Sequence, residues 1–204
     1  MKPRFVVLEG LDGCGKSTQA ERLCRALKEL GRNVVHLREP GATPLGERIR
    51  SVLLDPASSD IGLTTEAILY SACRSQMVRA RVTPALKAGQ DVVCERYFYS
   101  TLAYQGHAGG EDLEALWSLS RYATGGLLPD RVVVLDLEVD RALERLKGTP
   151  DRIEGRGAAY FEKVRRGFLD LAHEDPDRFR VVDASQSLDS VAHATLQAVQ
   201  DLLA

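Results

Sequence analysis

The residues best suited to chemistry form a glycine-rich loop near the start of the chain, within the segment GLDGCGKST. Gly10 is followed by four residues and then by Gly15, Lys16 and Ser17, which is the spacing of a phosphate-binding loop. Glycines allow backbone N–H groups to turn toward an anion, and the start of a following helix adds its dipole. We expect Lys16 to reach the β- and γ-phosphates of a nucleoside triphosphate and Ser17 to offer its hydroxyl to Mg²⁺.

The segments on either side of the loop support this interpretation. Residues 5–8 are apolar and predict a buried strand, and residues 16–30 carry apolar side chains at helical spacing until Gly31. A glycine turn without any ligand is the alternative, and the strand–loop–helix context makes it the weaker one. The whole loop is therefore predicted to bind the phosphates of the donor nucleotide, through Gly10, Leu11, Asp12, Gly13, Cys14, Gly15, Lys16, Ser17 and Thr18.

Composition excludes several classes of partner. The chain has 204 residues, 44% hydrophobic and 27% charged, with a net charge of −2, which argues against broad electrostatic binding to nucleic acid or anionic membranes. No apolar run approaches membrane-spanning length and no secretory signal is recognisable, so we expect a cytoplasmic enzyme that acts on small anions.

The cysteines lack metal-ligand or Cys-x-x-Cys spacing and are predicted to be buried free thiols, at positions Cys14, Cys24, Cys73 and Cys94.

Strands and helices are predicted to alternate along the chain. Apolar runs predict strands at residues 5–8, 33–37, 91–97, 132–136 and 179–182. Helical spacing predicts helices at about residues 16–30, 45–54, 64–81, 111–122, 139–146, 160–172 and 187–203, with Thr64 and Ser187 as N-caps and Pro84 as a breaker. This alternation indicates a single α/β domain over residues 1–204, with a five-stranded parallel sheet and helices on both faces.

Further polar groups follow the predicted strands. Glu95 and Arg96 end the strand at 91–97, and because the carboxyl ends of parallel strands line the ligand crevice, we expect them beside the phosphate loop. A surface ion pair is the weaker alternative. The short turn that contains Tyr104 and Gln105 supplies a ring and an amide, which are suited to reading the edge of a base.

The helix at 64–81 has two faces of different character. Apolar spacing predicts a core face formed by Leu69, Cys73, Met77 and Ala80. On the adjacent face, Tyr70 and Arg74 lie one turn apart and could stack on a planar ring and bind its polar edge. Judged on this helix alone, an exposed Arg74 beside a half-buried Tyr70 is the better interpretation.

A polar segment near residue 150 differs from the rest of the chain. Residues 148–157 read GTPDRIEGRG, which is too polar to pack and too charged to be inert. We interpret residues 148–158 as a mobile lid over the phosphates, with a plain solvated loop as the alternative.

Together these segments resemble the bacterial thymidylate kinase family, a group of P-loop nucleoside monophosphate kinases. The resemblance rests on GLDGCGKST, LREPGATPLGERIR, LYSACRSQ, ERYFYSTLAYQG and DRIE, which cover residues 5 to about 155 in consistent order. It implies a P-loop NTPase fold, a homodimer, and Mg²⁺-dependent transfer of the γ-phosphoryl group from ATP to thymidine monophosphate (dTMP) during dTTP synthesis. A guanine-specific switch is disfavoured because no Asn-Lys-x-Asp segment occurs.

The resemblance also assigns residues to the acceptor nucleotide. It implies that Tyr70 stands where the family usually places a phenylalanine stacked on thymine, and that Thr101 replaces a common serine. Base-reading positions fall on Arg74 and Gln105. The full set implied for acceptor binding is Asp12, Glu39, Pro40, Arg50, Tyr70, Arg74, Arg96, Thr101, Tyr104 and Gln105.

Two departures from the family pattern concern catalysis. The resemblance implies that Ser17 and the residue at position 95 hold Mg²⁺. Glu95 replaces a common aspartate there and is one methylene longer, so its carboxylate could be displaced from its usual contact with the loop or with a water on Mg²⁺. Gly13 stands where eukaryotic-type enzymes carry an arginine, which implies that a lid arginine neutralises the transferring phosphate. Arg152 within DRIE is the first choice, and Arg156 is the second. The resemblance thus gives Lys16, Glu95, Arg96 and Arg152 as the catalytic set.

Two other functions stay open from the sequence. A kinase of another nucleoside monophosphate, such as uridylate or cytidylate, would share the crevice, and the single methyl group that separates thymine from uracil is worth only about 1 to 3 kcal/mol. An ATP-hydrolysing switch or binding module would use the same phosphate loop without an acceptor nucleotide.

Overall fold

A parallel β-sheet organises the fold. The computed structural model describes residues 2–146 and 148–203, and within them the chain forms five parallel strands in the order β2-β3-β1-β4-β5. They are β1 (Phe5–Glu9), β2 (Val34–Arg38), β3 (Asp91–Glu95), β4 (Arg131–Asp136) and β5 (Phe179–Asp183). The predicted α/β fold with a five-stranded parallel sheet is confirmed.

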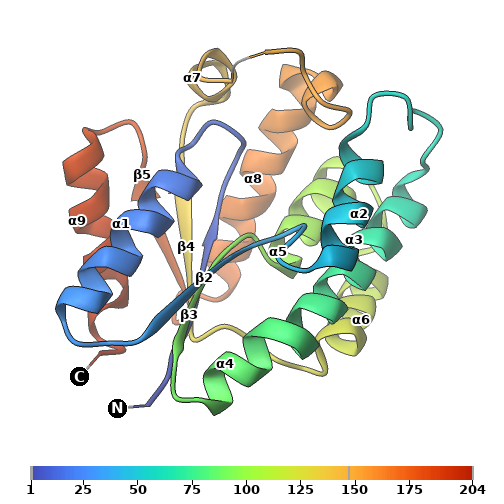
Figure 1. Cartoon of the computed structure of the whole chain (residues 1–204). Helices are drawn as coiled ribbons and strands as arrows, with labels where there is room; N and C mark the ends of the chain where they lie inside the picture. Colours follow the sequence, from blue (N-terminus) through green and yellow to red (C-terminus); the bar gives the residue numbers. More distant parts are fainter. Residues whose placement is uncertain (1, 147, 204) are drawn as a thin grey trace.

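The strand sequences account for this order. The runs FVVLE, DVVCE and RVVVLD of β1, β3 and β4 are buried along almost their whole length, as expected for central strands covered on both faces. The edge strands β2 and β5 each bury only two of five residues. Since all strands run the same way, their carboxyl ends meet at one edge of the sheet, at the top of Figure 1.

Helices cover both faces of the sheet, as predicted. In Figure 1, α1 and α9 lie on one side, and α3, α4, α5 and α8 lie on the other. The helices are α1 (Lys16–Glu29), α2 (Pro44–Leu54), α3 (Leu63–Met77), α4 (Thr83–Lys87), α5 (Phe98–Thr101), α6 (Leu113–Thr124), α7 (Val139–Glu144), α8 (Ala158–Glu174) and α9 (Leu188–Gln200). Two π-helical segments, Val78–Val82 and Leu102–Ala108, and one 3₁₀ turn, Glu154–Arg156, complete the set among the described residues.

The first π-helical segment corrects two expectations. Pro84 does not interrupt the helix, because the wider turn at Val78–Val82 joins α3 to α4. A proline lacks an N–H and clashes with the carbonyl four residues earlier, and a π turn changes the hydrogen-bond register at that point. The same change of register turns Ala80 to the surface, whereas Cys73 and Met77 are buried as predicted. The N-cap of α3 is Gly62 and not Thr64.

Other local predictions are confirmed. Ser187 caps α9 by accepting a hydrogen bond from the backbone N–H of Ser190. The predicted helix at 111–122 is present as α6, and its partly buried Trp117 packs against Phe98 of α5, with ring centroids 5.1 Å apart. The four cysteines are free and buried. In the described part of the chain, none of the helices is long and apolar enough to cross a membrane.

Candidate active site

The phosphate loop lies between β1 and α1, at the carboxyl edge of the sheet. Gly15 takes a left-handed conformation (φ 98°) as the N-cap of α1. The Lys16 ammonium, only 8% exposed, donates to the carbonyls of Leu11 (2.7 Å) and Gly10 (3.1 Å). The loop opens into a cavity, here named the phosphate pocket, lined by Asp12, Gly13, Gly15, Lys16, Ser17, Thr18, Arg38, Glu39, Arg50, Glu95, Arg96 and Arg145.

Gly13 lies in direct contact with α7. A Cβ built on Gly13 would lie 2.1 Å from the carbonyl oxygen of Ala142, and the backbone there has φ +81°. No side chain fits at this position without moving α7 or the loop. The loop of this chain therefore has no room for an arginine or any other side chain at this position.

Ser17, Glu95 and His36 form a hydrogen-bonded row beside the loop. The Ser17 hydroxyl donates to Glu95 Oε2 (2.5 Å), and His36 Nε2 lies 2.9 Å from Glu95 Oε1. Burial tends to raise the pKa of Glu95, but the hydrogen bonds from His36 and Ser17 outweigh it and lower the pKa. The longer side chain of Glu95 thus still reaches the loop. Sequence reasoning missed His36, whose position in β2 beside β3 is visible only from the strand pairing.

Arg96 lies at the centre of the crevice, directly after β3. It has φ +65°, a strained conformation for a residue with a side chain. Its guanidinium group donates to Asp12 Oδ1 (2.6 Å), to the Gly10 carbonyl (3.0 Å) and to the Tyr104 hydroxyl (3.2 Å). Burial raises the pKa of Asp12, but Arg96 and Lys16 together lower it below its usual range.

A buried carboxylate behind Arg96 fixes this turn of the chain. Glu9, at the end of β1, accepts from the backbone N–H of Tyr97 (2.8 Å) and from the Ser100 hydroxyl (2.6 Å). Burial raises the pKa of Glu9, opposed mainly by the charge of Arg96. Neither Glu9 nor Ser100 was predicted in the site, because a carboxylate that ends an apolar strand looks like any strand terminus.

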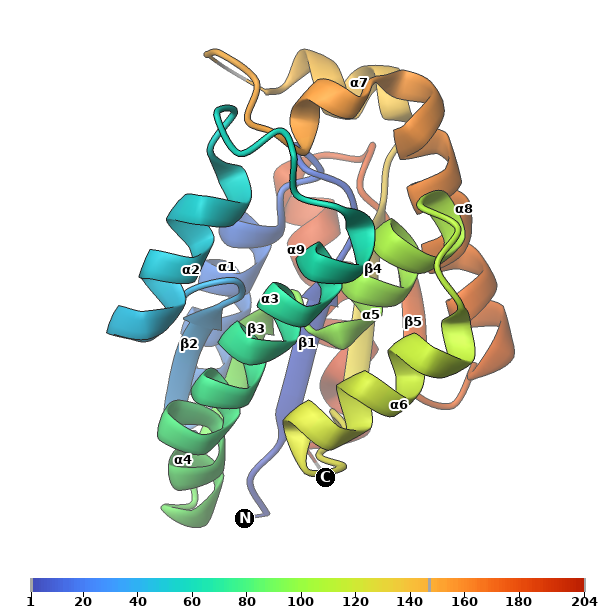
Figure 2. The same cartoon turned by 90° about the vertical axis from the view of Figure 1, so that its right-hand side faces the viewer.

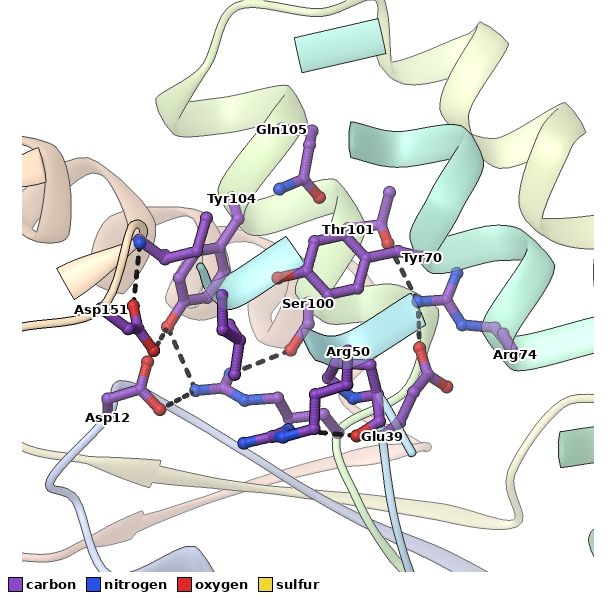
Figure 3. Close-up of a pocket in the computed structure, with 14 residues that line it drawn as sticks. Asp12, Glu39, Arg50, Tyr70, Arg74, Ser100, Thr101, Tyr104, Gln105 and Asp151 are labelled. Atoms are coloured by element: carbon purple, nitrogen blue, oxygen red, sulfur yellow. Dashed lines mark hydrogen bonds and ion pairs between the residues drawn. The ribbon is translucent and has the colours of Figure 1, made fainter. Parts of the chain in front are cut away.

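A second pocket adjoins the phosphate pocket and is shown in Figure 3. Every residue that the resemblance assigned to the acceptor nucleotide lines it. The lining residues are Asp12, Glu39, Pro40, Arg50, Leu54, Tyr70, Arg74, Arg96, Ser100, Thr101, Tyr104, Gln105, Asp151 and Ile153. Of these, Leu54, Ser100, Asp151 and Ile153 were not predicted.

Arg74 is fully buried at the wall of the second pocket, so the expectation of an exposed arginine is wrong. It forms an ion pair with Glu39, and its Nη2 donates to Thr101 Oγ1 (3.0 Å). Its Nε and Nη1 have no hydrogen-bond partner in the described part of the chain. Burial raises the pKa of Glu39 to about 7, against the opposing effect of Arg74. Arg74 therefore lines the same cavity as Tyr70, with its guanidinium group held in place by Glu39 and Thr101.

The two pockets share one wall. Asp12, Glu39, Arg50 and Arg96 line both of them. Burial, and to a lesser extent the nearby charge of Arg38, lowers the pKa of Arg50. An anion in either pocket would lie close to the same arginines.

The segment predicted as a lid packs over the second pocket. Arg152 Nε donates to the Leu53 carbonyl at the end of α2 (2.7 Å), and Ile153 is only 4% exposed. Arg152 and Arg156 each place an Nη2 atom 2.6 Å from Glu66 Oε2. The segment is thus not too polar to pack, because Glu66, buried in α3, pairs with its arginines.

The position of the lid arginines also differs from the expected one. Neither Arg152 nor Arg156 is among the residues that line the phosphate pocket, whereas Arg145, just after α7, does line it. Arg145 also lines a groove on the far side of the loop, together with Gly13, Cys14, Gly15, Thr18, Gln19, Ala184, Gln186, Leu188 and Val191. Sequence reasoning missed Arg145, which lies before the polar segment and resembles an ordinary helix-end cation.

Comparisons with known proteins agree with this geometry. A family model described as thymidylate kinase matches residues 8–194. A thymidylate kinase of Symbiobacterium thermophilum is 45% identical over 200 residues, covering 98% of this chain and 94% of that protein. Thymidylate kinases of Bifidobacterium longum and Deinococcus radiodurans are each 45% identical, over 207 and 199 residues, covering 99% and 97% of this chain and 100% and 96% of those proteins.

Proposed function

The chain belongs to the thymidylate kinase family, and we propose that its two adjoining pockets bind the two nucleotides of the family's reaction. The enzyme transfers the γ-phosphoryl group of ATP to dTMP, giving ADP and dTDP on the route to dTTP. ATP binds on the phosphate loop, and dTMP binds in the second pocket, from here on called the acceptor pocket.

The shared wall is the observation that carries this proposal. Arg50 and Arg96 line both pockets, and arginine binds phosphate through charge-assisted hydrogen bonds. An acceptor phosphate held by these two side chains lies next to the donor phosphates on the loop. Phosphoryl transfer requires chiefly such placement, together with neutralisation of the negative charge that spreads in the transition state.

The acceptor pocket supplies groups for a thymine ring. Tyr70 offers an aromatic face for stacking. The guanidinium group of Arg74 lines the pocket and has only donors, so it matches a carbonyl oxygen of the base, and Thr101 holds its Nη2 atom. In this proposal Asp12 and Tyr104, both in contact with Arg96, lie beside the sugar of dTMP.

We propose that ATP binds on the phosphate loop and in the groove beside it. Lys16 leaves its contacts with the loop carbonyls and pairs with the β- and γ-phosphates. The groove lined by Arg145 and Gln186 continues from the loop away from the acceptor pocket, and it accommodates the adenosine part of ATP.

The residues around Ser17 fit a magnesium ion. Mg²⁺ prefers oxygen ligands and in kinases is held by one or two protein groups together with waters and phosphates, so the pair of Ser17 hydroxyl and Glu95 carboxylate is an adequate donor set. Among the described residues there is no cluster of three or more His, Cys, Asp or Glu side chains that could hold a metal by itself. When bound, Mg²⁺ neutralises phosphate charge and orients the transferred group. We propose that Ser17 binds it directly and Glu95 through water.

The transferring phosphate needs a further cation, which we assign to Arg152 in the lid. In the structure Arg152 is paired with Glu66 over the acceptor pocket, so contact with the γ-phosphate requires a lid rearrangement when both nucleotides are present. Such closure is a common feature of phosphoryl transfer, where it excludes water from the reacting groups.

An apolar surface supports the homodimer that we propose. Large apolar side chains are exposed on three adjacent helices, namely Leu45 and Val52 on α2, Ile68 on α3 and Leu113 on α6. These helices lie side by side on the face shown in Figure 2. Sedimentation at micromolar concentration tests this assignment. We also propose a cytoplasmic location, which the buried free cysteines fit.

The direct test of the function is ADP release, measured by a coupled assay with dTMP, dUMP, dCMP or no acceptor. We expect ADP release that depends on dTMP, with dUMP second because it lacks only one methyl group. ADP release that is equally fast without any acceptor would instead identify an ATP-hydrolysing switch.

A further inference from the structure

Glu66 is a fully buried carboxylate that the proposed reaction does not use. It lies in the first turn of α3 with 0% of its surface exposed. Its Oε1 accepts a hydrogen bond from Gln105 Nε2 (2.6 Å), and its Oε2 contacts Arg152 and Arg156 of the lid at 2.6 Å each. One carboxylate thus joins a residue of the acceptor pocket to both lid arginines.

The contact with Glu66 fixes the orientation of the Gln105 amide. An ionised carboxylate has only acceptor positions, so Gln105 must turn its NH₂ group toward Glu66. The amide oxygen Oε1 then has no hydrogen-bond partner in the described part of the chain, and Gln105 lines the acceptor pocket. In Figure 3 this oxygen points away from the amide nitrogen, on the side where Thr101 and Tyr70 lie. Gln105 therefore offers the pocket an acceptor and not a donor.

Arg74 and Gln105 together present a definite hydrogen-bond pattern. Arg74 contributes a guanidinium group, which can only donate, and Gln105 contributes a carbonyl acceptor. Thymine has a carbonyl acceptor at position 4 next to an N–H donor at position 3, which is the complementary pattern. Cytosine has an amino donor at position 4 and an unprotonated nitrogen at position 3, so both of its groups face like groups.

The lid arginines make the buried charge of Glu66 tolerable. A carboxylate removed from water requires charged partners, and Arg152 and Arg156 supply them. Arg156 is held in place by the Tyr160 hydroxyl (2.7 Å), and Tyr160 in turn donates to the Tyr104 carbonyl (2.7 Å). In this structure the charge that orients Gln105 is thus balanced by the two lid arginines.

We propose that Glu66 is a positioning residue that selects a thymine-type acceptor edge by fixing the amide of Gln105. The inference rests on the proposed function, since it takes the second pocket to be the dTMP site. It adds a determinant of base choice that touches neither nucleotide. Because the lid arginines hold the same carboxylate, base reading and lid closure depend on one side chain.

The test compares acceptors in the Glu66→Gln variant. A neutral amide at position 66 can donate as well as accept, so Gln105 is free to turn over and offer its NH₂ group to cytosine. We expect the ratio of kcat/KM for dTMP to that for dCMP to fall by at least about tenfold, the cost of one mismatched buried hydrogen bond. The ratio for dTMP and dUMP should stay unchanged, because both bases present the same edge.

Two controls separate this effect from general damage. Glu111→Gln makes the same chemical change just before α6, where the side chain of Glu111 accepts a hydrogen bond from Thr64 and does not contact the Gln105 amide, and it should leave both ratios unchanged. If Glu66→Gln fails to fold, Glu66→Asp keeps the charge for the arginines but withdraws the carboxylate from Gln105, and it should show the same fall.

The outcomes are distinguishable. A dTMP-to-dCMP ratio within about twofold of the wild-type value in a folded Glu66 variant overturns the inference and leaves the proposed function intact. A wild-type protein that does not phosphorylate dTMP overturns the proposed function itself, and the inference with it.

Discussion

The phosphate pocket and the acceptor pocket differ in how the chain builds them. Half of the residues that line the phosphate pocket lie within residues 12–18, where backbone N–H groups and one helix start are available to an anion. The acceptor pocket takes its side chains from stretches spread between residue 12 and residue 153. A site made of main chain depends on local spacing, whereas a site made of side chains depends on how distant elements pack. Variants in the two pockets should therefore fail in different ways.

The largest effect is expected in the phosphate pocket. Lys16→Ala removes the one side-chain cation of the loop, and turnover should fall by about 10²- to 10³-fold, as when a single charge-stabilising donor is lost. Affinity for dTMP, measured by calorimetry, should change little. Lys28→Ala, on the exposed face of the same helix, is the matched control. A Lys16→Ala enzyme within tenfold of the wild-type turnover would show that the loop binds its anion by main chain alone.

Arg152→Ala tests whether the lid arginine takes part in phosphoryl transfer or only covers the acceptor pocket. Turnover should fall by roughly 10²-fold or more, by analogy with other transition-state arginines, while dTMP binding stays nearly intact. Arg166→Ala, an exposed arginine on α8, provides the comparison. Unchanged steady-state turnover would mean that the lid arginine only pairs with Glu66 and takes no part in the transfer.

Arg74→Ala should affect the acceptor pocket alone. We expect the dissociation constant of dTMP to rise by roughly 10- to 100-fold and that of ATP to change by no more than a few-fold. The variant also leaves Glu39 without its partner, so the double variant Arg74→Ala/Glu39→Gln controls for the unpaired charge. Equal losses of both affinities in calorimetry would indicate damage to the whole fold.

The smallest expected effect is a change of stability with pH at Glu39. Burial raises its pKa to about 7 in the folded protein, from its ordinary value of 4.5. Between these two values the folded state binds more protons at this carboxyl than the unfolded state, so the stability of the wild type falls as pH rises through this window. Glu39→Gln has no titrating carboxyl at this position. The free energy of unfolding of the wild type should therefore fall by about 1 to 3 kcal/mol more across this pH window than that of the variant.

Urea unfolding of both proteins at pH 5 and pH 8 measures the difference. The free energy of unfolding of the wild type should decline more between the two pH values than that of Glu39→Gln. Parallel behaviour of the two proteins would show that Arg74 keeps the pKa of Glu39 near its ordinary value.

The same contrast explains what the sequence could predict. The strands, most helices and the phosphate loop follow from patterns within a few residues, and each occurs close to its expected position. The acceptor residues were placed by resemblance, and all of them line one pocket. The burial of Arg74 could not be predicted from its helix, because its partner Glu39 lies in another part of the chain.

Features that depend on packing against another element escaped prediction. The π turn that passes Pro84 and turns Ala80 outward depends on how α3 continues into α4. Glu66 resembles an ordinary acidic residue in the first turn of a helix, and only the fold brings Gln105 and the lid arginines to it. Arg145 lines the phosphate pocket, but it lies before residues 148–158, the segment in which the sequence predicted a phosphate-binding arginine.

Gly13 also brings the phosphate loop into direct contact with the carbonyl of Ala142 in α7. Since α1 begins at the end of the same loop, α7 and α1 are packed on one short segment of the chain. We therefore expect spin labels on α7 and on α1 to keep a constant separation throughout turnover.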